Sequence, residues 1–414
     1  MSAARPCRPR LPTPPRPLPN AALALLLGLW LLLAAPVLAL SDAQQLVVEA
    51  WRLVNQSYLD PARFEAVHWR RLRQSTLEQP IHSTGDAYDA ISAMLAPLGD
   101  PYTRLLRPED YASLMANTQG SVSGVGLQLA LRSADDRIVV IAPLDGSPAA
   151  DAGIQSGTAV MSVNGTDTAD LGLEGTASAL RGDAGSRVLL QLETPAGLRR
   201  EVELERRSVN LQPVRSRLIR TGDRLVGYLR ITQFSEPVPA QVQEVLSSEA
   251  FNAIGGLILD LRNNSGGLVS AGLAVANDLL DREPIVTTQD RDGLSTPAEA
   301  GPGVLFGGPM VTLVNGGTAS ASEILAGALQ DDGRSQLLGS RTFGKGLIQT
   351  LIPLGDGSGL AVTVARYLTP CGRAIQNLGL EPDVTLPQPE PFNPGGDDDR
   401  WLDQAASVLL ELLG

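Results

Sequence analysis

Apolar and polar positions divide the chain into segments of different periodicity. An Arg- and Pro-rich stretch is followed by a continuous apolar run over residues 21–40, and Val37-Leu38-Ala39 fits a small-residue cleavage site. This pattern is typical of a secretory signal peptide. The run is also about as long as a membrane span of ~20 residues, so a retained anchor is the alternative. We expect residues 1–39 to be a signal peptide and the rest of the protein to be exported.

Between residues 40 and 115, apolar residues recur at helical spacing. Ser41 followed by Gln44 has the pattern of a capping box at a helix start. The apolar face that follows consists of Leu46, Val47, Ala50, Trp51, Val54 and Tyr58. Spacings of three and four residues place these side chains on one side of a helix. The sequence therefore predicts a helical N-terminal section that packs on another part of the protein.

Residues 116–208 change to short alternating runs separated by glycine turns. The predicted strands are 125–131, 138–141, 159–163 and 188–192. Alternation of apolar and polar residues over such short runs indicates half-buried strands. We expect a β-rich domain here.

Strands and helices alternate over residues 209–386. The predicted strands are 225–234, 256–261, 310–314, 337–339 and 360–367, and the predicted helices are 240–248, 271–280 and 320–330. This order indicates an α/β sheet with helical crossovers. Residues 387–414 read as a Pro/Gly linker followed by a short amphipathic helix.

Composition excludes several classes of site. The formal net charge is −12, which argues against nucleic-acid binding. The two cysteines, Cys7 and Cys371, cannot build a disulfide scaffold or a cysteine zinc site. The two histidines, His68 and His82, exclude a histidine-rich metal site and disfavour a Ser-His-Asp triad. We expect neither a metal nor another cofactor.

Lysine occurs once, at Lys345, in a chain that otherwise uses arginine. Unlike arginine, lysine can lose its proton and act as a base. Its pKa must then fall from about 10.4 towards 7, and burial can lower it. Ser320 begins a predicted helix, where free N–H groups would stabilise an oxyanion. With Glu323 three residues later, Ser320 also fits an ordinary capping box, so a purely structural role is the alternative.

Geometry permits Ser320 and Lys345 to meet. A helix over 320–330 rises about 16 Å, and a strand through Leu337 returns a similar distance. The segment 260–267, DLRNNSGG, reads as a strand followed by a glycine turn. Such a turn needs no function, but its backbone N–H groups are also candidates for a second oxyanion donor.

A phosphate-binding loop is the rival interpretation of residues 339–346, GSRTFGKG. Gly346 stands where that motif needs Ser or Thr for the metal. The apolar stretch after it is a poor match for the helix that the motif requires. An exported protein would also meet no ATP pool. The sequence therefore disfavours nucleotide binding.

Three ordered motifs carry a family resemblance: DLRNNSGG at 260–267, VNGGTASASEI at 314–324 and FGKGLIQ at 343–349. Together they resemble the tail-specific, carboxyl-terminal processing serine peptidases. Segments 100–106, 365–372 and 378–382 match as well. The resemblance implies a crotonase-like α/β protease core over 209–386, interrupted upstream by an inserted PDZ domain over 116–208. It covers nearly all of the chain after the leader.

The resemblance also assigns roles to individual residues. Ser320 matches the family nucleophile and Lys345 its general base, while Gly266 or Gly267, with Ala321, matches the oxyanion donors. The carboxylate-binding loop of the PDZ domain matches Gly124, Val125, Gly126 and Leu127.

Two further assignments depend on geometry. Gln349 matches the residue that orients the lysine, and it needs a helical turn because four residues of strand would span about 13 Å. Asp331 matches an aspartate that some members use in catalysis. At the far end of the helix it lies about 16 Å from Ser320, so it could equally cap or orient a neighbour.

The opening helix 49–52 and the segment 100–106 are most similar to the photosynthetic branch of the family. That branch trims the C-terminal extension of the photosystem II reaction-centre precursor in the thylakoid lumen. We therefore expect protein tails as substrates, presented near a membrane, and a location in the thylakoid lumen or periplasm. A catalytically silent PDZ scaffold that binds protein tails is the alternative function, and the Ser320–Lys345 pair argues against it.

Overall fold

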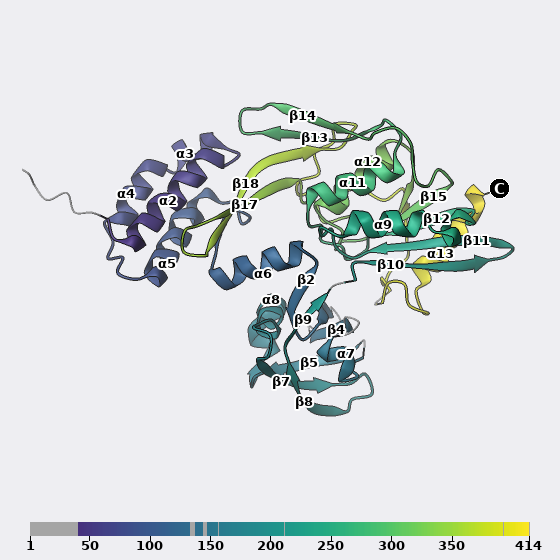
Figure 1. The fold of residues 1–414 in the computed structure, drawn as a ribbon, viewed down its shortest axis with the longest axis horizontal. Coiled ribbons are helices and arrows are strands. Elements are labelled where there is room, and N and C mark those ends of the chain that lie inside the picture. The colour runs from purple at the N-terminus through teal and green to yellow at the C-terminus, as the bar shows by residue number, and fades with distance from the viewer. Residues whose placement is uncertain are drawn as a thin grey trace, which may run out of the picture.

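The computed structural model describes residues 40–132, 137–143, 147–155, 157–210, 212–391 and 393–413, and Figure 1 shows its fold. The predicted signal peptide, residues 1–39, lies outside the described residues. Among the helices of the described part, none is long and apolar enough to cross a membrane.

Residues 40–118 form the helical section. Its helices are α2 (Asp42–Ser57), α3 (Pro61–Ala66), α4 (Trp69–Leu77), α5 (Thr84–Leu95), the 3₁₀ turn η1 (Ala96–Leu98) and α6 (Pro108–Thr118). Helices α2 to α5 lie at the left of Figure 1, and α6 lies near its centre, above the β-rich domain. Ser41 and Gln44 form the predicted capping box at the start of α2. The buried face of α2 packs with Leu360 and Val362 of the neighbouring sheet. The prediction of a helical section that packs on the body is confirmed.

An antiparallel sheet joins these helices to the core. Its strands are β1 (Arg104–Leu106), β13 (Pro284–Asp290), β14 (Ser295–Glu299), β17 (Leu347–Pro353) and β18 (Gly359–Leu368). The strand order is β1-β18-β13-β14, and β17 also pairs with β18. In Figure 1 this sheet runs from the N-terminal helices to the centre of the molecule. Only β18 was predicted from the sequence.

The β-rich domain lies below the rest of the molecule in Figure 1. Its elements are β2 (Ser121–Gly124), β3 (Leu127–Arg132), β4 (Arg137–Pro143), α7 (Pro148–Asp151), β5 (Ala159–Val163), β6 (Thr166–Asp167), α8 (Thr168–Leu180), β7 (Arg187–Glu193), β8 (Arg199–Glu205) and β9 (Arg207–Asn210). The sheet order is β3-β4-β5-β7-β8, so β3 is an edge strand. All four predicted strands are present within a few residues of their predicted bounds.

The core sheet has the order β10-β11-β12-β15-β16-β19. Its strands and the helices around it are β10 (Val214–Thr221), β11 (Arg224–Ile231), α9 (Val238–Leu246), α10 (Glu249–Asn252), β12 (Gly256–Asp260), α11 (Val269–Leu279), β15 (Met310–Val314), α12 (Ala321–Asp331), β16 (Gln336–Gly339), β19 (Val384–Thr385) and α13 (Arg400–Leu412). Neighbouring strands from β11 to β19 are parallel, and β10 is antiparallel to β11. The predicted α/β sheet with helical crossovers is confirmed.

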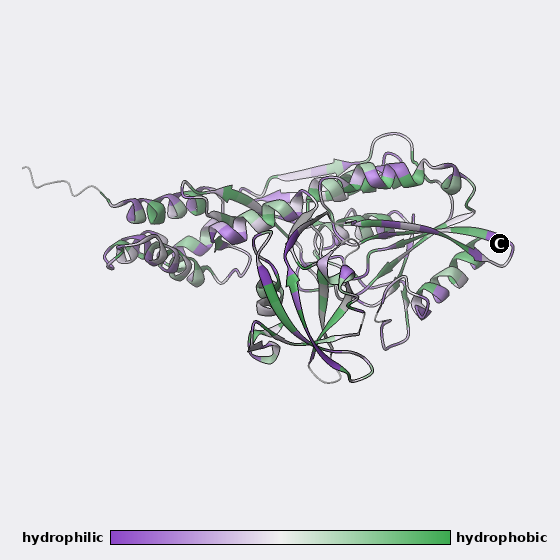
Figure 2. Ribbon diagram, turned by 60° about the horizontal axis from the view of Figure 1, so that its bottom comes forward, coloured by the Kyte–Doolittle hydropathy of each residue, from purple (hydrophilic) through white to green (hydrophobic). Residues whose placement is uncertain are grey.

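Helices cover both faces of the core sheet. Apolar residues of α9, α11 and α12 form one hydrophobic cluster with alternate residues of β11 and β12. On the other face, Val226, Tyr228 and Ile258 of these strands form a second cluster with apolar residues of α13, among them Trp401 and Leu409. Figure 2 shows hydrophobic and hydrophilic residues on different sides of α13, near the C label. Helix α12 is the most enclosed, because residues 321–329 are all buried.

A buried charge network fixes the end of β12. Burial alone would raise the pKa of Asp260, but the Arg230 and Arg262 guanidinium groups lower it to about 2. Arg262 also forms an ion pair with Asp399 at 2.6 Å, and Tyr228 donates a hydrogen bond to Asp260 at 2.7 Å. Because buried charges are costly unless paired, this network fixes the chain just before the 261–267 turn.

Candidate active site

Ser320 lies at the N-terminus of α12, between a glycine-containing turn and the buried helix. Its backbone has φ 57° and ψ −120°, a conformation that non-glycine residues rarely adopt. Such strain persists only where the surroundings impose it, and it concentrates at functional sites. The side chain is half-buried. The structure thus holds a serine in a strained turn at the positive end of a helix dipole.

The carboxylate of Glu323 connects Ser320 to Lys345. One oxygen, Oε2, accepts hydrogen bonds from the backbone N–H of Ser320 and from that of Lys345, each at 2.9 Å. The other oxygen accepts from the Thr342 hydroxyl at 2.5 Å and the Gly344 N–H at 2.8 Å. Glu323 is fully buried. Its predicted capping interaction with Ser320 is confirmed, and the same carboxylate brings the backbone of Lys345 beside that of Ser320.

The 261–267 turn is joined to the segment that precedes α12. Asn264 accepts through its carbonyl oxygen from the Ala319 N–H at 3.0 Å and the Ser322 hydroxyl at 2.9 Å. Asn315 and Asn263 exchange two further bonds, each at 2.8 Å. These four hydrogen bonds join the 261–267 turn to the segment that leads into Ser320.

Gly266 and Gly267 approach the backbone more closely than any side chain would allow. A Cβ at Gly266 would lie 2.8 Å from the Cβ of Ser320, and one at Gly267 would lie 2.1 Å from the carbonyl oxygen of Phe234. The Gly266 N–H already donates to the side chain of Asn264 at 2.9 Å. Within the described residues, the N–H groups of Gly267 and Ala321 have no acceptor. Those two N–H groups are therefore the ones available to a substrate oxygen.

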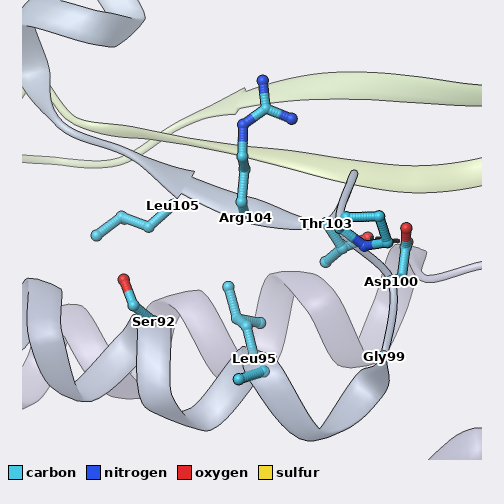
Figure 3. A pocket seen from close by; sticks show the side chains of 9 residues that line it. Ser92, Leu95, Gly99, Asp100, Thr103, Arg104 and Leu105 are labelled. Atoms are coloured by element: carbon cyan, nitrogen blue, oxygen red, sulfur yellow. Dashed lines mark hydrogen bonds between the residues drawn. The ribbon is translucent and has the colours of Figure 1, made fainter. Parts of the chain in front are cut away.

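Lys345 extends towards the N-terminal section. Its Nζ lies 5.0 Å from the ring centroid of Tyr102. Burial lowers the pKa of Lys345, the nearby Arg104 guanidinium lowers it further, and Asp100 opposes both effects. Asp100 and Arg104 line a cavity of about 410 Å³. Figure 3 shows that the Arg104 side chain extends from β1 in the direction away from helix α5. The surroundings of the single lysine thus shift its proton equilibrium towards the neutral, proton-accepting form.

The hydrogen bonds of Gln349 and Asp331 join these residues to other parts of the protein than Ser320 and Lys345. No helical turn follows Lys345: β17 begins at Leu347, so the predicted turn is wrong, and the Gln349 amide donates to the Thr363 hydroxyl at 3.4 Å. Asp331 lies at the opposite end of α12 from Ser320, where it pairs with Arg373 and accepts from the Cys371 N–H. The described contacts of both residues are with other partners than Ser320 or Lys345.

The same strand removes the phosphate-loop interpretation. That motif requires a helix immediately after the loop, whose N–H groups would hold phosphate. Residues 347–353 instead pair with β18 along their whole length. Asp260, the candidate magnesium ligand of that interpretation, is bound by Arg230 and Arg262. In the described ranges, no group of three or more His, Cys, Asp or Glu side chains is placed to hold a metal ion.

The segment Gly124–Leu127 borders a groove of about 830 Å³. Gly126 has φ 73°, a turn conformation suited to glycine. The groove is lined by this segment, by the end of α8 with Ala177 and Leu180, and by α6. Arg104 borders both this groove and the smaller cavity beside Lys345. The groove therefore leads from the β-rich domain towards the surroundings of the lysine.

Sequence reasoning missed three residues of this site. Glu323 was interpreted only as a cap, although its carboxylate also binds the Lys345 segment. Tyr102, under the Lys345 ammonium, was noted only as part of a matching segment. The Tyr367 hydroxyl donates towards the carbonyl oxygens of Ser320 and Lys345, at 3.1 and 2.6 Å. No spacing signal marks Tyr102 or Tyr367, since both are brought to the site by sheet pairing.

Comparisons with known proteins agree with this architecture. The PDZ domain profile matches residues 113–193, and that of peptidase family S41 matches residues 225–386. A carboxyl-terminal-processing protease of Picosynechococcus sp. is 44% identical over 399 residues, covering 95% of this chain and 96% of its own length. One of Synechocystis sp. is 43% identical over 373 residues, covering 89% and 87%.

A solved structure supports the same conclusion. The photosystem II D1 C-terminal processing protease superposes with a TM-score of 0.66 at 38% identity, covering 89% of this chain and 98% of its own. The resemblance inferred from the three motifs is thereby confirmed. The chain belongs to peptidase family S41, as a serine peptidase of the carboxyl-terminal-processing group that carries a PDZ domain.

Proposed function

We propose that this peptidase is an exported enzyme that uses Ser320 as nucleophile and Lys345 as general base. The observation that carries the proposal is the shared Glu323 oxygen, because it joins the backbones of a strained serine and of the only lysine in the chain. Export is supported by the signal-peptide pattern of residues 1–39. A location in the thylakoid lumen or periplasm follows from export and from the photosynthetic relatives.

In the proposed reaction, neutral Lys345 takes the proton of the Ser320 hydroxyl as Oγ attacks the peptide carbonyl carbon. The oxyanion accepts hydrogen bonds from the Gly267 and Ala321 N–H groups, supported by the positive end of α12. The lysine then gives the proton to the leaving amine, and the peptide bond breaks. Water, deprotonated by Lys345, releases the acyl group and restores Ser320.

Substrate selection is proposed to depend on the PDZ groove. The N–H groups of Val125, Gly126 and Leu127 would bind the terminal carboxylate, since successive amides of this kind form an anion site. An extended tail would add as a strand beside β3, whose position at the sheet edge supports this mode. The substrate class is then membrane-proximal proteins with a free C-terminal tail.

The D1 precursor of photosystem II is the proposed substrate, because a solved relative that is 38% identical to this chain is named as a photosystem II D1 C-terminal processing protease. Gln349 and Asp331 are given no role in the proton transfer. Their roles as orienting and catalytic residues stay predictions from the resemblance, and the contacts with Thr363 and Arg373 support structural roles instead.

The test is to incubate the purified protein with a peptide of the D1 precursor C-terminus and to identify products by mass. We expect one internal cleavage that releases the extension. Ser320→Ala and Lys345→Arg should each lower kcat by about 10³-fold or more, since each removes an essential partner of the proton transfer. Lys345→Arg keeps the charge but cannot accept a proton.

Ser322→Ala is the matched control, because its hydroxyl bonds only to the Asn264 carbonyl. It should keep most of the turnover. Binding of the peptide without cleavage by the unmodified protein would favour the scaffold function instead. Normal turnover by a folded Lys345→Arg variant would remove the lysine from the mechanism.

A further inference from the structure

Tyr367 lies buried on β18, between the start of α12 and the segment that precedes β17. Its side chain is 2% exposed. The hydroxyl lies 2.6 Å from the Lys345 carbonyl oxygen and 3.1 Å from that of Ser320. The backbone N–H of Tyr367 donates to the Gly346 carbonyl oxygen at 3.0 Å. One residue therefore contacts both the serine turn and the lysine segment.

Tyr367 and Glu323 bind the backbones of the same two residues, one as a hydrogen-bond donor and the other as an acceptor. Glu323 accepts from the N–H groups of Ser320 and Lys345, whereas Tyr367 donates towards their carbonyl oxygens. Burial raises the pKa of Tyr367 well above 10, and the Glu323 carboxylate raises it further. The phenol consequently keeps its proton and remains a donor over the working pH range.

A residue that joins the two backbones is needed because Ser320 and Lys345 lie far apart in the sequence. Ser320 and Lys345 belong to different elements, and Lys345 carries its amine on a long, flexible side chain. Proton transfer needs the two side-chain atoms at hydrogen-bond separation, and an error of about 1 Å can cost ~10²-fold in rate. Fixing the two backbones against each other reduces that freedom.

We propose that Tyr367 is a positioning residue: its hydroxyl, bound to the carbonyl oxygens of Ser320 and Lys345, sets the separation of nucleophile and base. The proposal rests on the Ser320–Lys345 mechanism given above. Tyr367 itself takes no part in proton transfer, because its hydroxyl is directed at backbone carbonyls. The side chain therefore acts on the chemical step and not on tail binding in the PDZ groove.

The test compares Tyr367→Phe with Tyr88→Phe on the D1 tail peptide. Tyr88 of α5 is also buried, and its hydroxyl donates a hydrogen bond of 2.7 Å to Asp356 in the turn between β17 and β18. We expect Tyr367→Phe to lower kcat about 10-fold or more at unchanged KM, since only the chemical step loses alignment. Tyr88→Phe should leave both kinetic constants unchanged.

Thermal unfolding of both variants separates positioning from general stability. A Tyr367→Phe protein with the kcat of the unmodified enzyme would overturn the inference, as would a loss of kcat shared by Tyr88→Phe. Introducing p-aminophenylalanine at position 367 restores a hydrogen-bond donor, and we expect it to recover part of the lost kcat. No recovery in a folded protein of unchanged melting temperature would contradict a donor role.

The failure of this inference is distinguishable from failure of the mechanism. If Ser320→Ala and Lys345→Arg are inactive while Tyr367→Phe is fully active, only the positioning role is wrong. If Lys345→Arg turns over normally, the mechanism itself is wrong and the role of Tyr367 falls with it.

Discussion

The turn that presents Ser320 is enclosed, whereas the groove beside Gly124–Leu127 is open. At Ser320, a buried carboxylate and a buried phenol bind the backbone, and Gly266 packs against the Ser320 side chain. Along the PDZ groove, the lining comes from a sheet edge and from exposed or half-buried residues of α6.

The contrast indicates what each region has to do. Bond cleavage requires the reacting atoms at fixed separations. The residues around Ser320 are therefore held by buried hydrogen bonds, with which water does not compete. Tail recognition requires backbone N–H and C=O groups that stay available until a strand arrives. Changes at the enclosed site should therefore act on kcat, and changes at the open groove should act on substrate capture.

Gly266→Ala should have the largest effect among changes that leave the proposed nucleophile and base in place. The new Cβ would meet the Ser320 Cβ and the Ala319 carbonyl oxygen at 2.8 Å, and this clash has to displace the serine turn. We expect kcat to fall about 100-fold at nearly constant KM. Steady-state peptide cleavage measures both constants.

Gly293→Ala is the control for this substitution. Gly293 also has a positive φ, 75°, but a Cβ there would meet nothing within 4 Å. It should lose stability by about 1 kcal/mol and no turnover. Equal kinetics for the two variants would show that the close contact at Gly266 is irrelevant to catalysis.

Amidation of the substrate tail should have an intermediate effect on kcat/KM, because it weakens binding at the open groove. The amide removes the charge that the 124–127 amides would bind, and charge-assisted hydrogen bonds contribute about 1.5–3 kcal/mol. We expect kcat/KM to fall at least ~10-fold relative to the free acid, through KM.

The same experiment tests whether the two regions act independently. If they act independently, amidation should slow Gly266→Ala by the same factor as the unmodified enzyme, because free-energy changes at distant sites add. Equal rates for the free acid and the amide would end the proposal of carboxylate recognition.

Charge changes beside Lys345 should have the smallest effect, seen in the pH dependence. The base must be neutral, so kcat/KM rises as pH increases through the lowered pKa of Lys345. Arg104 lowers that pKa and Asp100 raises it. Arg104→Gln should therefore move the acidic limb to higher pH, and Asp100→Asn should move it to lower pH.

The size of these shifts follows from exposure. Interactions between exposed charges contribute about 0.2–1 kcal/mol, which corresponds to about 1.4- to 5-fold in rate at fixed pH. Shifts of the same sign in the two variants would contradict the assignment of Lys345 as the titrating base.

Much of the fold was predictable because its signals are local. Strands β5 and β15 have the predicted bounds, and α2 begins at the predicted capping box. The β13–β14 hairpin and β17 were missed. The burial of their residues does not alternate between the two faces, and β14 is mostly exposed, so the hydrophobic period was weak.

The site was predictable only where a residue type was rare or a motif matched. Lys345 stood out as the single lysine, and Ser320 stood out by its place before a helix. The hydrogen bonds by which Glu323 and Tyr367 join the backbones of Ser320 and Lys345 could not be predicted from the sequence. It depends on long-range pairing of β18 with β13 and β17, which leaves no trace in local spacing.

The burial of residues 321–329 of α12 has a consequence for how the enzyme loses activity. A helical stretch enclosed on every side exchanges its amide protons only when the whole core unfolds. The amides of residues 324–329 should then be among the slowest to exchange with deuterium, whereas those of the edge strand β3 exchange through local opening. Heating should consequently abolish activity and core structure together, with no temperature at which a folded core carries a melted active site.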